Sequence, residues 1–375
     1  MTIRPAGSIR ALAVTAVLAA ACGSVAAPAT GSASSPSASA ATVAGTPSPN
    51  STPASNQCPP PSNRCLAVVS LRGTNPYVVR DITSIVHPIT VSTFGTIPPP
   101  QFVSGTELSY ADETGLFRMP LEGSPKTRVD KSTQGVAAIA WSPSGSTVAY
   151  LATTSAGLAL HLQSASQDRV VAGSIPALPV VGCESQFCGD TWDFGLSYSP
   201  DGASISLVES IANVNSFRLW SSDGKLLISS DSEARSMSAW SGHSFYFPGP
   251  KGVDMWREGI TTSFLPAVSW IRPNASPAGG QIVYQTNDAQ GWAHTLVVDT
   301  ATRKVRELKK ARSGPVFLTS RYIWYKGQRS CVASDYCPPG WTVVASGKTY
   351  IYDLVDGTET ESIITAVYDV WPHAA

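Results

Sequence analysis

Cysteine is the residue type in this sequence whose spacing most directly suggests chemistry. Seven cysteines occur among 375 residues, and six of them form three local pairs: Cys58 with Cys65, Cys183 with Cys188, and Cys331 with Cys337. An even number of closely spaced cysteines is typical of disulfides in an exported chain, although spacing alone also allows other connectivities. Zinc is the rival interpretation, but no pair has CxxC spacing and no histidine clusters beside one. We expect three local disulfides, no metal site and no cofactor.

The seventh cysteine, Cys22, ends the N-terminal segment. Arg4 and Arg10 precede a short apolar run, residues 11–21, which is too short to span a bilayer. This arrangement resembles a bacterial lipoprotein signal, in which small residues precede a cysteine that is lipidated and becomes the mature N-terminus. We therefore predict a signal peptide over residues 1–21 and a lipid anchor at Cys22, on the extracytoplasmic side of the cell membrane. An ordinary secretory signal cleaved nearby is the alternative.

A low-complexity linker is predicted over residues 22–57. Beyond Cys22 it is dominated by Ala, Ser, Thr, Pro and Gly, with no charged and no aromatic residue. Such a composition cannot bury a core, so we expect it to be disordered. As a flexible coil it would hold a domain roughly 30–35 Å from the anchor. The folded domain is predicted over residues 58–375.

The other residues that could do chemistry show no catalytic pattern. The five histidines lack metal-ligand spacings such as HxH or HExxH: His87, His161, His243, His294 and His373. No GxSxG elbow, phosphate-binding P-loop or GxGxxG motif occurs. Arg80 and Asp81, with His87 soon after, could belong to a site, but an Arg–Asp pair on an exposed strand is the interpretation that we favour. Catalytic residues therefore stay unassigned.

Charge composition argues against one class of partner. Lys plus Arg and Asp plus Glu both number 26, which gives a formal net charge of zero, and only 14% of residues are charged. An average soluble domain has about 25%. Because nucleic-acid binding needs a basic surface, we expect no nucleic-acid partner.

The elements that position these residues are repeated hairpins. Ala138–Tyr150 (AIAWSPSGSTVAY) holds a short apolar run ending in an aromatic residue, then a Ser-Pro-x-Gly turn and a strand-like alternation. Its nearest copy is Gly195–Leu207, and two looser copies are Met237–Phe247 and Val268–Tyr284. A hairpin that recurs at intervals of about 40 residues indicates a β-propeller.

The third strand of each unit is the clearest element. Seven segments alternate in this way: Tyr77–Ile82, Leu116–Leu121, Leu158–Gln163, Phe217–Ser222, Val253–Glu258, Thr295–Thr300 and Tyr350–Val355. A fourth strand follows most of them: Ile89–Phe94, Lys126–Asp130, Asp168–Ala172, Lys225–Ser230, Lys304–Leu308 and Glu361–Thr365. The predicted fold is all-β, a single propeller of seven four-stranded blades. Six blades with a small N-terminal cap are the alternative.

The two ends of the domain test the blade count. The first unit has three predicted strands, Leu66–Leu71, Tyr77–Ile82 and Ile89–Phe94, and lacks an innermost one. The last unit is complete by Thr365, yet the strand-like segment Ala366–Trp371 follows it. We predict that this segment supplies the missing strand, because closing the ring removes an open sheet edge.

Four aromatic residues occupy the end of the apolar run in the copies: Trp141, Tyr198, Trp240 and Trp270. They could form a sugar-stacking set. One aromatic residue per blade at a strand end is, however, what packing between blades requires. We expect a structural role.

The two best copies resemble the repeats of TolB-type and WD-repeat-like propellers of the bacterial cell envelope. They are Trp141-Ser142-Pro143-Ser144-Gly145 and Tyr198-Ser199-Pro200-Asp201-Gly202. The resemblance covers residues 65–371 as architecture, and propellers host many functions. It implies a surface or central funnel that is presented to protein partners or small ligands. The N-terminal α/β domain of TolB proteins is not visible in the sequence.

The cysteine pairs indicate which face would be used. Cys183/Cys188 follow an outer strand and Cys331/Cys337 follow a second strand, so both insertions open on one face of a propeller. Cys58/Cys65 and the linker join at the opposite face. We expect a lipid-anchored monomer that binds an envelope protein or a small molecule on the face of the insertions. The alternative is a hydrolase or lyase acting on envelope glycans or peptides, with carboxylates from several blades in the funnel.

Overall fold

A computed structural model of the chain describes residues 58, 64–73, 77–85, 87–94, 100–112, 114–129, 136–154, 157–165, 167–175, 193–211, 214–232, 238–266, 268–332 and 342–373. Every regular element in this part of the chain is a β-strand. A helix long and apolar enough to cross a bilayer does not occur within these ranges.

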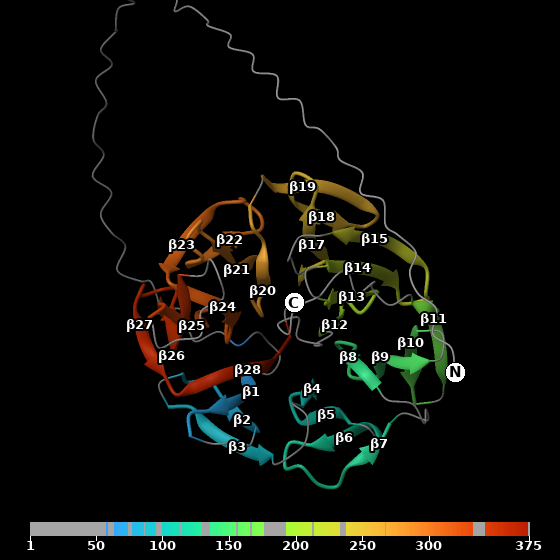
Figure 1. The fold of residues 1–375 in the computed structure, drawn as a ribbon. Helices are drawn as coiled ribbons and strands as arrows, with labels where there is room; N and C mark the ends of the chain where they lie inside the picture. Colours follow the sequence, from blue (N-terminus) through green and yellow to red (C-terminus); the bar gives the residue numbers. More distant parts are fainter. Residues whose placement is uncertain are drawn as a thin grey trace, which may run out of the picture. The chain divides into compact units, whose positions relative to one another are not determined.

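The strands form seven four-stranded antiparallel sheets, which are the blades of a propeller (Figure 1). From the innermost strand outward, blade one contains β28 (Ile364–Trp371), β1 (Leu66–Leu71), β2 (Tyr77–Asp81) and β3 (Ile89–Phe94); blade two β4 (Gln101–Ser104), β5 (Glu107–Asp112), β6 (Gly115–Pro120) and β7 (Thr127–Arg128); blade three β8 (Val136–Trp141), β9 (Thr147–Thr154), β10 (Gly157–Ser164) and β11 (Asp168–Ile175); blade four β12 (Asp193–Tyr198), β13 (Ser204–Ile211), β14 (Val214–Ser221) and β15 (Leu226–Ser232); blade five β16 (Ala239–Ser241), β17 (Ser244–Gly249), β18 (Gly252–Arg257) and β19 (Ile260–Pro266); blade six β20 (Ile271–Ala275), β21 (Gln281–Asn287), β22 (Ala293–Asp299) and β23 (Val305–Lys310); and blade seven β24 (Arg312–Phe317), β25 (Tyr322–Ser330), β26 (Val343–Asp353) and β27 (Glu359–Ser362). The prediction of seven blades is confirmed, and the six-bladed alternative is wrong.

The C-terminal strand closes the ring as predicted. β28 pairs antiparallel with β1, with Leu66 opposite Trp371 and Ser70 opposite Ala366. It begins at Ile364, two residues before the predicted start, and the outer strand β27 accordingly ends at Ser362 rather than at Thr365. Blade one is therefore built from both ends of the domain.

The hydrophobic core lies between the blades. Seven buried clusters occur in the described part of the chain, and each combines residues from two adjacent blades. Trp141, for example, lies in one cluster with Val103 and Leu116 of the preceding blade. Each blade is thus stabilised mainly by burying its two faces against its neighbours.

The register identifies the aromatic position more accurately than the sequence does. Six inner strands run directly into their second strand, and the residue before each turn pairs with an apolar residue: Phe102 with Leu108, Trp141 with Val148, Tyr198 with Ile205, Trp240 with Phe245, Ala275 with Ile282 and Phe317 with Ile323. Five of these six are aromatic. The assignment of Trp270 to this position is wrong, because Ala275 occupies it.

Each of these residues faces the second strand of the preceding blade, where the neighbour fits it in size and polarity. Two tryptophans meet serines: Trp141 Nε1 donates to Ser109 Oγ at 2.5 Å, and Trp240 Nε1 donates to Ser206 Oγ at 3.0 Å. The small Ala275 shares its cluster with the large Tyr246. The expected structural role of this position is therefore supported by its contacts.

The domain begins with a disulfide. Cys58 and Cys65 are joined with an S–S distance of 2.03 Å, and both are buried beside the start of β1. Cys331 is also disulfide-bonded. Its expected partner Cys337, together with Cys183, Cys188 and Cys22, lies outside the described residues.

Candidate functional site

Two Ser-Pro-x-Gly turns on adjacent blades have the same construction. In blade three the Ser142 N–H donates to Thr147 O at 2.9 Å and the Gly145 N–H donates to Ser142 O at 2.8 Å. Blade four repeats both bonds with Ser199 and Gly202 at nearly the same lengths. The glycines have φ of +68° and +72°, a left-handed conformation that favours glycine. The turns are therefore rigid and present matching side chains.

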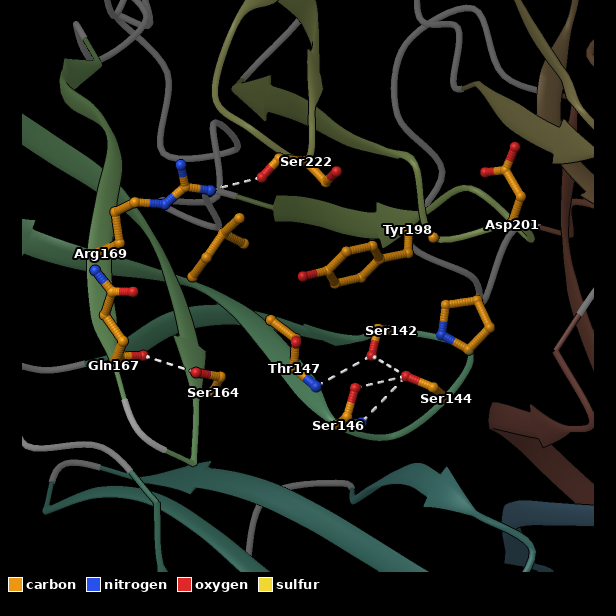
Figure 2. A pocket seen from close by; sticks show the side chains of 13 residues that line it. Ser142, Ser144, Ser146, Thr147, Ser164, Gln167, Arg169, Tyr198, Asp201 and Ser222 are labelled. Atoms are coloured by element: carbon orange, nitrogen blue, oxygen red, sulfur yellow. Dashed lines mark hydrogen bonds between the residues drawn. The ribbon is translucent and has the colours of Figure 1, made fainter.

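A groove of about 590 Å³ lies where these turns meet the hairpins between third and fourth strands. It is lined by residues of blades three and four: Ser142, Pro143, Ser144, Ser146, Thr147, Leu162, Ser164, Gln167, Arg169, Tyr198, Asp201, Gly202 and Ser222. Hydroxyl groups dominate this lining, as Figure 2 shows. The groove opens on the face that carries the turns between first and second strands, which is also the face where the linker joins at Cys65.

One wall of the groove is fixed by backbone contacts between the two blades. The Arg169 guanidinium donates to Ser222 O at 2.7 Å and to Asp223 O at 3.0 Å. These bonds join β11 of blade three to the turn after β14 of blade four. Since Arg169 is bound only through carbonyl oxygens in these contacts, its positive charge stays available to a ligand.

Tyr198 crosses the groove and is its most unusual residue. Its hydroxyl is buried and has no hydrogen-bond partner. Figure 2 shows this hydroxyl directed toward the wall that carries Arg169 and Gln167. Burial raises the pKa of Tyr198 above its usual range, and the charge of Arg169 only partly offsets this effect. The phenol is therefore a protonated donor at neutral pH, without an acceptor from the protein.

The repeat explains why this hydroxyl has no partner. Trp141 and Trp240 meet serines of the preceding blade, whereas the corresponding residue opposite Tyr198 is Ala149, which lies in the same cluster. An alanine accepts no hydrogen bond. A buried polar group left without a partner costs free energy, so a ligand acceptor in the groove would restore what the repeat lacks here.

Asp201 supplies the carboxylate at the rim. Burial alone would raise its pKa, but hydrogen bonds from Ser199 Oγ (2.6 Å) and the Ala203 N–H (2.9 Å), together with His243, outweigh burial and lower the pKa of Asp201 below its ordinary value. His243 Nδ1 lies 2.9 Å from Asp201 Oδ2. The carboxylate is thus ionised and held in place by the turn and by blade five.

The other residues singled out in the sequence are brought into separate contacts. His161 stacks on Tyr150 with ring centroids 4.7 Å apart, and its Nδ1 lies 3.2 Å from Asp168. His294 Nδ1 lies 2.8 Å from Glu307. His373 Nε2 lies 3.2 Å from Asp369, and His87 is exposed. Within the described ranges, no group of His, Cys, Asp and Glu side chains is arranged to hold a metal ion.

The expected pairing of Arg80 with Asp81 is wrong. Asp81 pairs with Arg64 at 2.7 Å, and Arg80 Nη2 donates to the Pro88 carbonyl oxygen at 2.6 Å. Adjacent residues of a strand point to opposite faces, which separates the two side chains. No site forms around them.

Sequence reasoning missed the groove itself. Its hydroxyl residues were read as parts of turns, and each turn taken singly is only a turn. The available signal was that the two best Ser-Pro-x-Gly copies stand in consecutive units, and that residues 142–147 and 199–204 are both rich in serine.

The fold and the groove define a seven-bladed β-propeller with a polar site between two blades. No known family description matches the chain, and no curated protein matches it in sequence. Among solved structures it is similar to a prolyl endopeptidase (TM-score 0.51, 14% identity, 79% of this chain and 49% of that one) and to a puromycin-hydrolyzing peptidase of Mycobacterium tuberculosis (0.50, 11%, 83% and 54%). TolB from Acinetobacter baumannii is also similar (0.40, 14%, 80% of both chains).

These likenesses concern the propeller fold alone, because the identities are 14% or lower. The chain spans only about half the length of the two peptidases. Their activities are therefore properties of those proteins.

Proposed function

We propose that this protein is a binding module that takes a polar, hydroxyl-rich ligand in the groove between blades three and four. The observation that carries the proposal is the Tyr198 hydroxyl, buried and unpartnered inside a groove lined by serines. Buried polar groups normally have partners, and a few convergent polar groups in a concave site are typical of ligand binding. A ligand with several hydroxyls would supply both the acceptor for Tyr198 and donors for the serines.

Binding is favoured over hydrolysis by the charges of the groove. Asp201 is the one carboxylate among the described residues that line it. Glycoside hydrolysis by acid and base uses two carboxyl groups about 5–9.5 Å apart. The groove therefore offers recognition groups without that pair, and the hydrolase alternative rests on no residue of this site.

The location of the protein belongs to the same proposal. The signal-like segment before Cys22 supports an anchored protein on the outer side of the cell membrane, with residues 22–57 as a flexible linker. The groove opens on the face where that linker joins, opposite to the face on which the sequence led us to expect a ligand. A linker of this length lets the groove reach soluble ligands as well as groups near the membrane.

The test is binding of neutral oligosaccharides and short polar peptides to the purified full chain, measured by calorimetry and ligand-observed NMR. We expect Tyr198→Phe to weaken binding about five- to tenfold, since one hydrogen bond of about 1 kcal/mol is lost. Its unfolding temperature should not fall, because an unpartnered hydroxyl is removed. Tyr284→Phe is the matched control, since burial also raises the pKa of this interblade tyrosine, to about 12.

Two outcomes would contradict the proposal. Equal binding by wild type and Tyr198→Phe would place the ligand elsewhere on the propeller. Release of shortened products during the titration would move the weight to the hydrolase alternative.

A further inference from the structure

A second cavity, of about 220 Å³, lies where the inner strands of blades six, seven and one approach the middle of the ring. Figure 1 shows β20, β24 and β28 side by side there. The cavity is lined by these three strands and by two residues of β25: Arg272, Pro273, Asn274, Gly314, Pro315, Val316, Trp324, Lys326, Ala366 and Val367. It shares no residue with the groove between blades three and four.

The charge of this cavity is one-sided. Arg272 and Lys326 are both exposed, and no carboxylate lines the cavity. Neither cation forms a salt bridge with a carboxylate in the part of the chain that the structure describes, where many other arginines and lysines do. Two like charges at one opening repel each other unless an anion joins them.

The backbone of Arg272 is strained in order to present this side chain. The pairing of β20 with β21 shifts between Ile271 and Asn274, and the pairing of β24 with β25 shifts between Ser313 and Val316. Both irregularities contain a residue with positive φ: Gly314 at 60° and Arg272 at 47°. Glycine accepts this conformation freely, but arginine does so only at a cost in free energy.

The glycine of blade seven leaves room for the arginine of blade six. A Cβ on Gly314 would lie 3.1 Å from Arg272 Nη1. The Gly314 N–H is fixed by Gln285 Oε1 at 2.9 Å, so its backbone cannot simply move away. The guanidinium therefore lies along blade seven, on the side where Lys326 is located.

The floor of the cavity is rigid. Trp324 is buried, and its Nε1 donates to Ile364 O at 2.9 Å. Lys326 Nζ lies 6.0 Å from the centroid of the Trp324 ring. The ammonium is thus kept near the indole rather than moving freely in solvent.

From this geometry we propose that the cavity is a binding site for an oxyanion group, a carboxylate or a phosphate, of a ligand that enters the central opening. The arginine offers a planar fork that matches such a group, and the lysine adds a second positive charge. The volume accommodates the charged group and a few further atoms of the ligand. This site is independent of the proposed groove ligand.

The experiment measures binding of inorganic phosphate, and of one short peptide with a free or an amidated C-terminus, to the full chain by NMR chemical-shift titration. We expect phosphate or the free carboxylate to bind with an affinity that weakens as salt is added. Tighter binding of phosphate, or of the free over the amidated peptide, identifies which oxyanion the site prefers.

The decisive variant is Arg272→Gly. It should weaken binding at least tenfold while raising the unfolding temperature by roughly 2 °C, because it relieves the backbone strain. Lys326→Met should also weaken binding. Arg303→Gly is the matched control, since Arg303 also has positive φ, 59°, but lies in the turn after β22 and outside the cavity. It should gain stability and keep full binding.

The result that overturns the proposal is equally clear. Binding of both probes that is unchanged in Arg272→Gly and Lys326→Met excludes this cavity as their site. The same conclusion follows if Arg303→Gly weakens binding as much as Arg272→Gly does, or if wild type binds neither probe.

Discussion

At the scale of single residues, the contact between blades depends on matched pairs. Trp141 donates to Ser109, and Trp240 donates to Ser206 one repeat interval further along the ring. Both indoles are largely buried, so each N–H would be left without a partner if the serine were absent. The serine is therefore an acceptor that the tryptophan requires.

Ser109→Ala tests this pairing. We expect the free energy of unfolding to fall by about 1–2 kcal/mol, because the buried Trp141 N–H loses its acceptor. Chemical denaturation of both proteins measures the difference. The double variant Ser109→Ala/Trp141→Phe should recover part of the loss relative to Trp141→Phe alone, as both polar groups are then removed. Losses that simply add would show that the two residues do not interact.

The sequence predicted the role of the aromatic position but misplaced one member. Trp270 attracted the assignment because it is the nearest aromatic residue before a Ser-Pro sequence. It lies ahead of β20, fully buried, with its ring 4.6 Å from that of Tyr284. The shifted register after Ile271 separates Trp270 from the turn, and such an irregularity leaves no mark in an apolar alternation.

At the scale of elements, blade seven is held together by a charged network. Arg312 on β24 donates to Glu359 on β27 at 2.6 and 3.0 Å, and the Tyr325 hydroxyl on β25 donates to the same carboxylate. Arg312 also lies 4.0 Å from the ring centroid of Tyr350 on β26. All four strands of the blade therefore meet at one carboxylate that is mostly shielded from solvent.

Glu359→Gln should destabilise the protein by about 2 kcal/mol at neutral pH, since a charge-assisted network loses its anion. Burial would raise the pKa of Glu359, but the hydrogen bonds from Arg312 and Tyr325 outweigh it and lower the pKa below the ordinary 4.5. The stabilisation is thus present above pH 4.5 and fades as the pH falls through the lower pKa of the folded state.

Denaturation curves collected from pH 7 down to pH 3 check this prediction. The difference between wild type and Glu359→Gln should shrink in acid. Glu361→Gln is the control, because Glu361 pairs with Arg72 and Lys348 at the exposed surface and should contribute little. A difference that is constant with pH would mean that the carboxylate charge is not what stabilises the blade.

The elements themselves were largely predictable, because period-two alternation and turn residues mark strands locally. All seven third strands were found within a few residues, as were six of the fourth strands. The outer strand of blade five, β19 (Ile260–Pro266), was not predicted. The two cavities were not predictable either, since each combines residues of different blades that no local pattern connects.

At the scale of the whole molecule, the ring depends on one strand from the far end of the chain. β28 pairs with β1 along its length, and it also bonds to blade two, because the Phe102 N–H donates to Asp369 Oδ2 at 2.6 Å. The same strand borders the cavity of Arg272 and Lys326. Closure of the ring and assembly of the central cavity are therefore a single event.

Deleting residues 364–375 should consequently abolish cooperative folding. The deletion removes the inner strand of blade one and leaves both β1 and the inner end of blade two without their partners, and an open edge of this kind invites aggregation. Loss of a sharp thermal transition by circular dichroism is the expected result. Asp369→Ala should be much milder, about 2 kcal/mol, because it removes one charge-assisted bond and leaves the strand pairing intact. A synthetic peptide of residues 364–375 added to the truncated chain should restore the transition. A truncated chain that unfolds cooperatively without the peptide would show that six blades and a partial seventh suffice for folding.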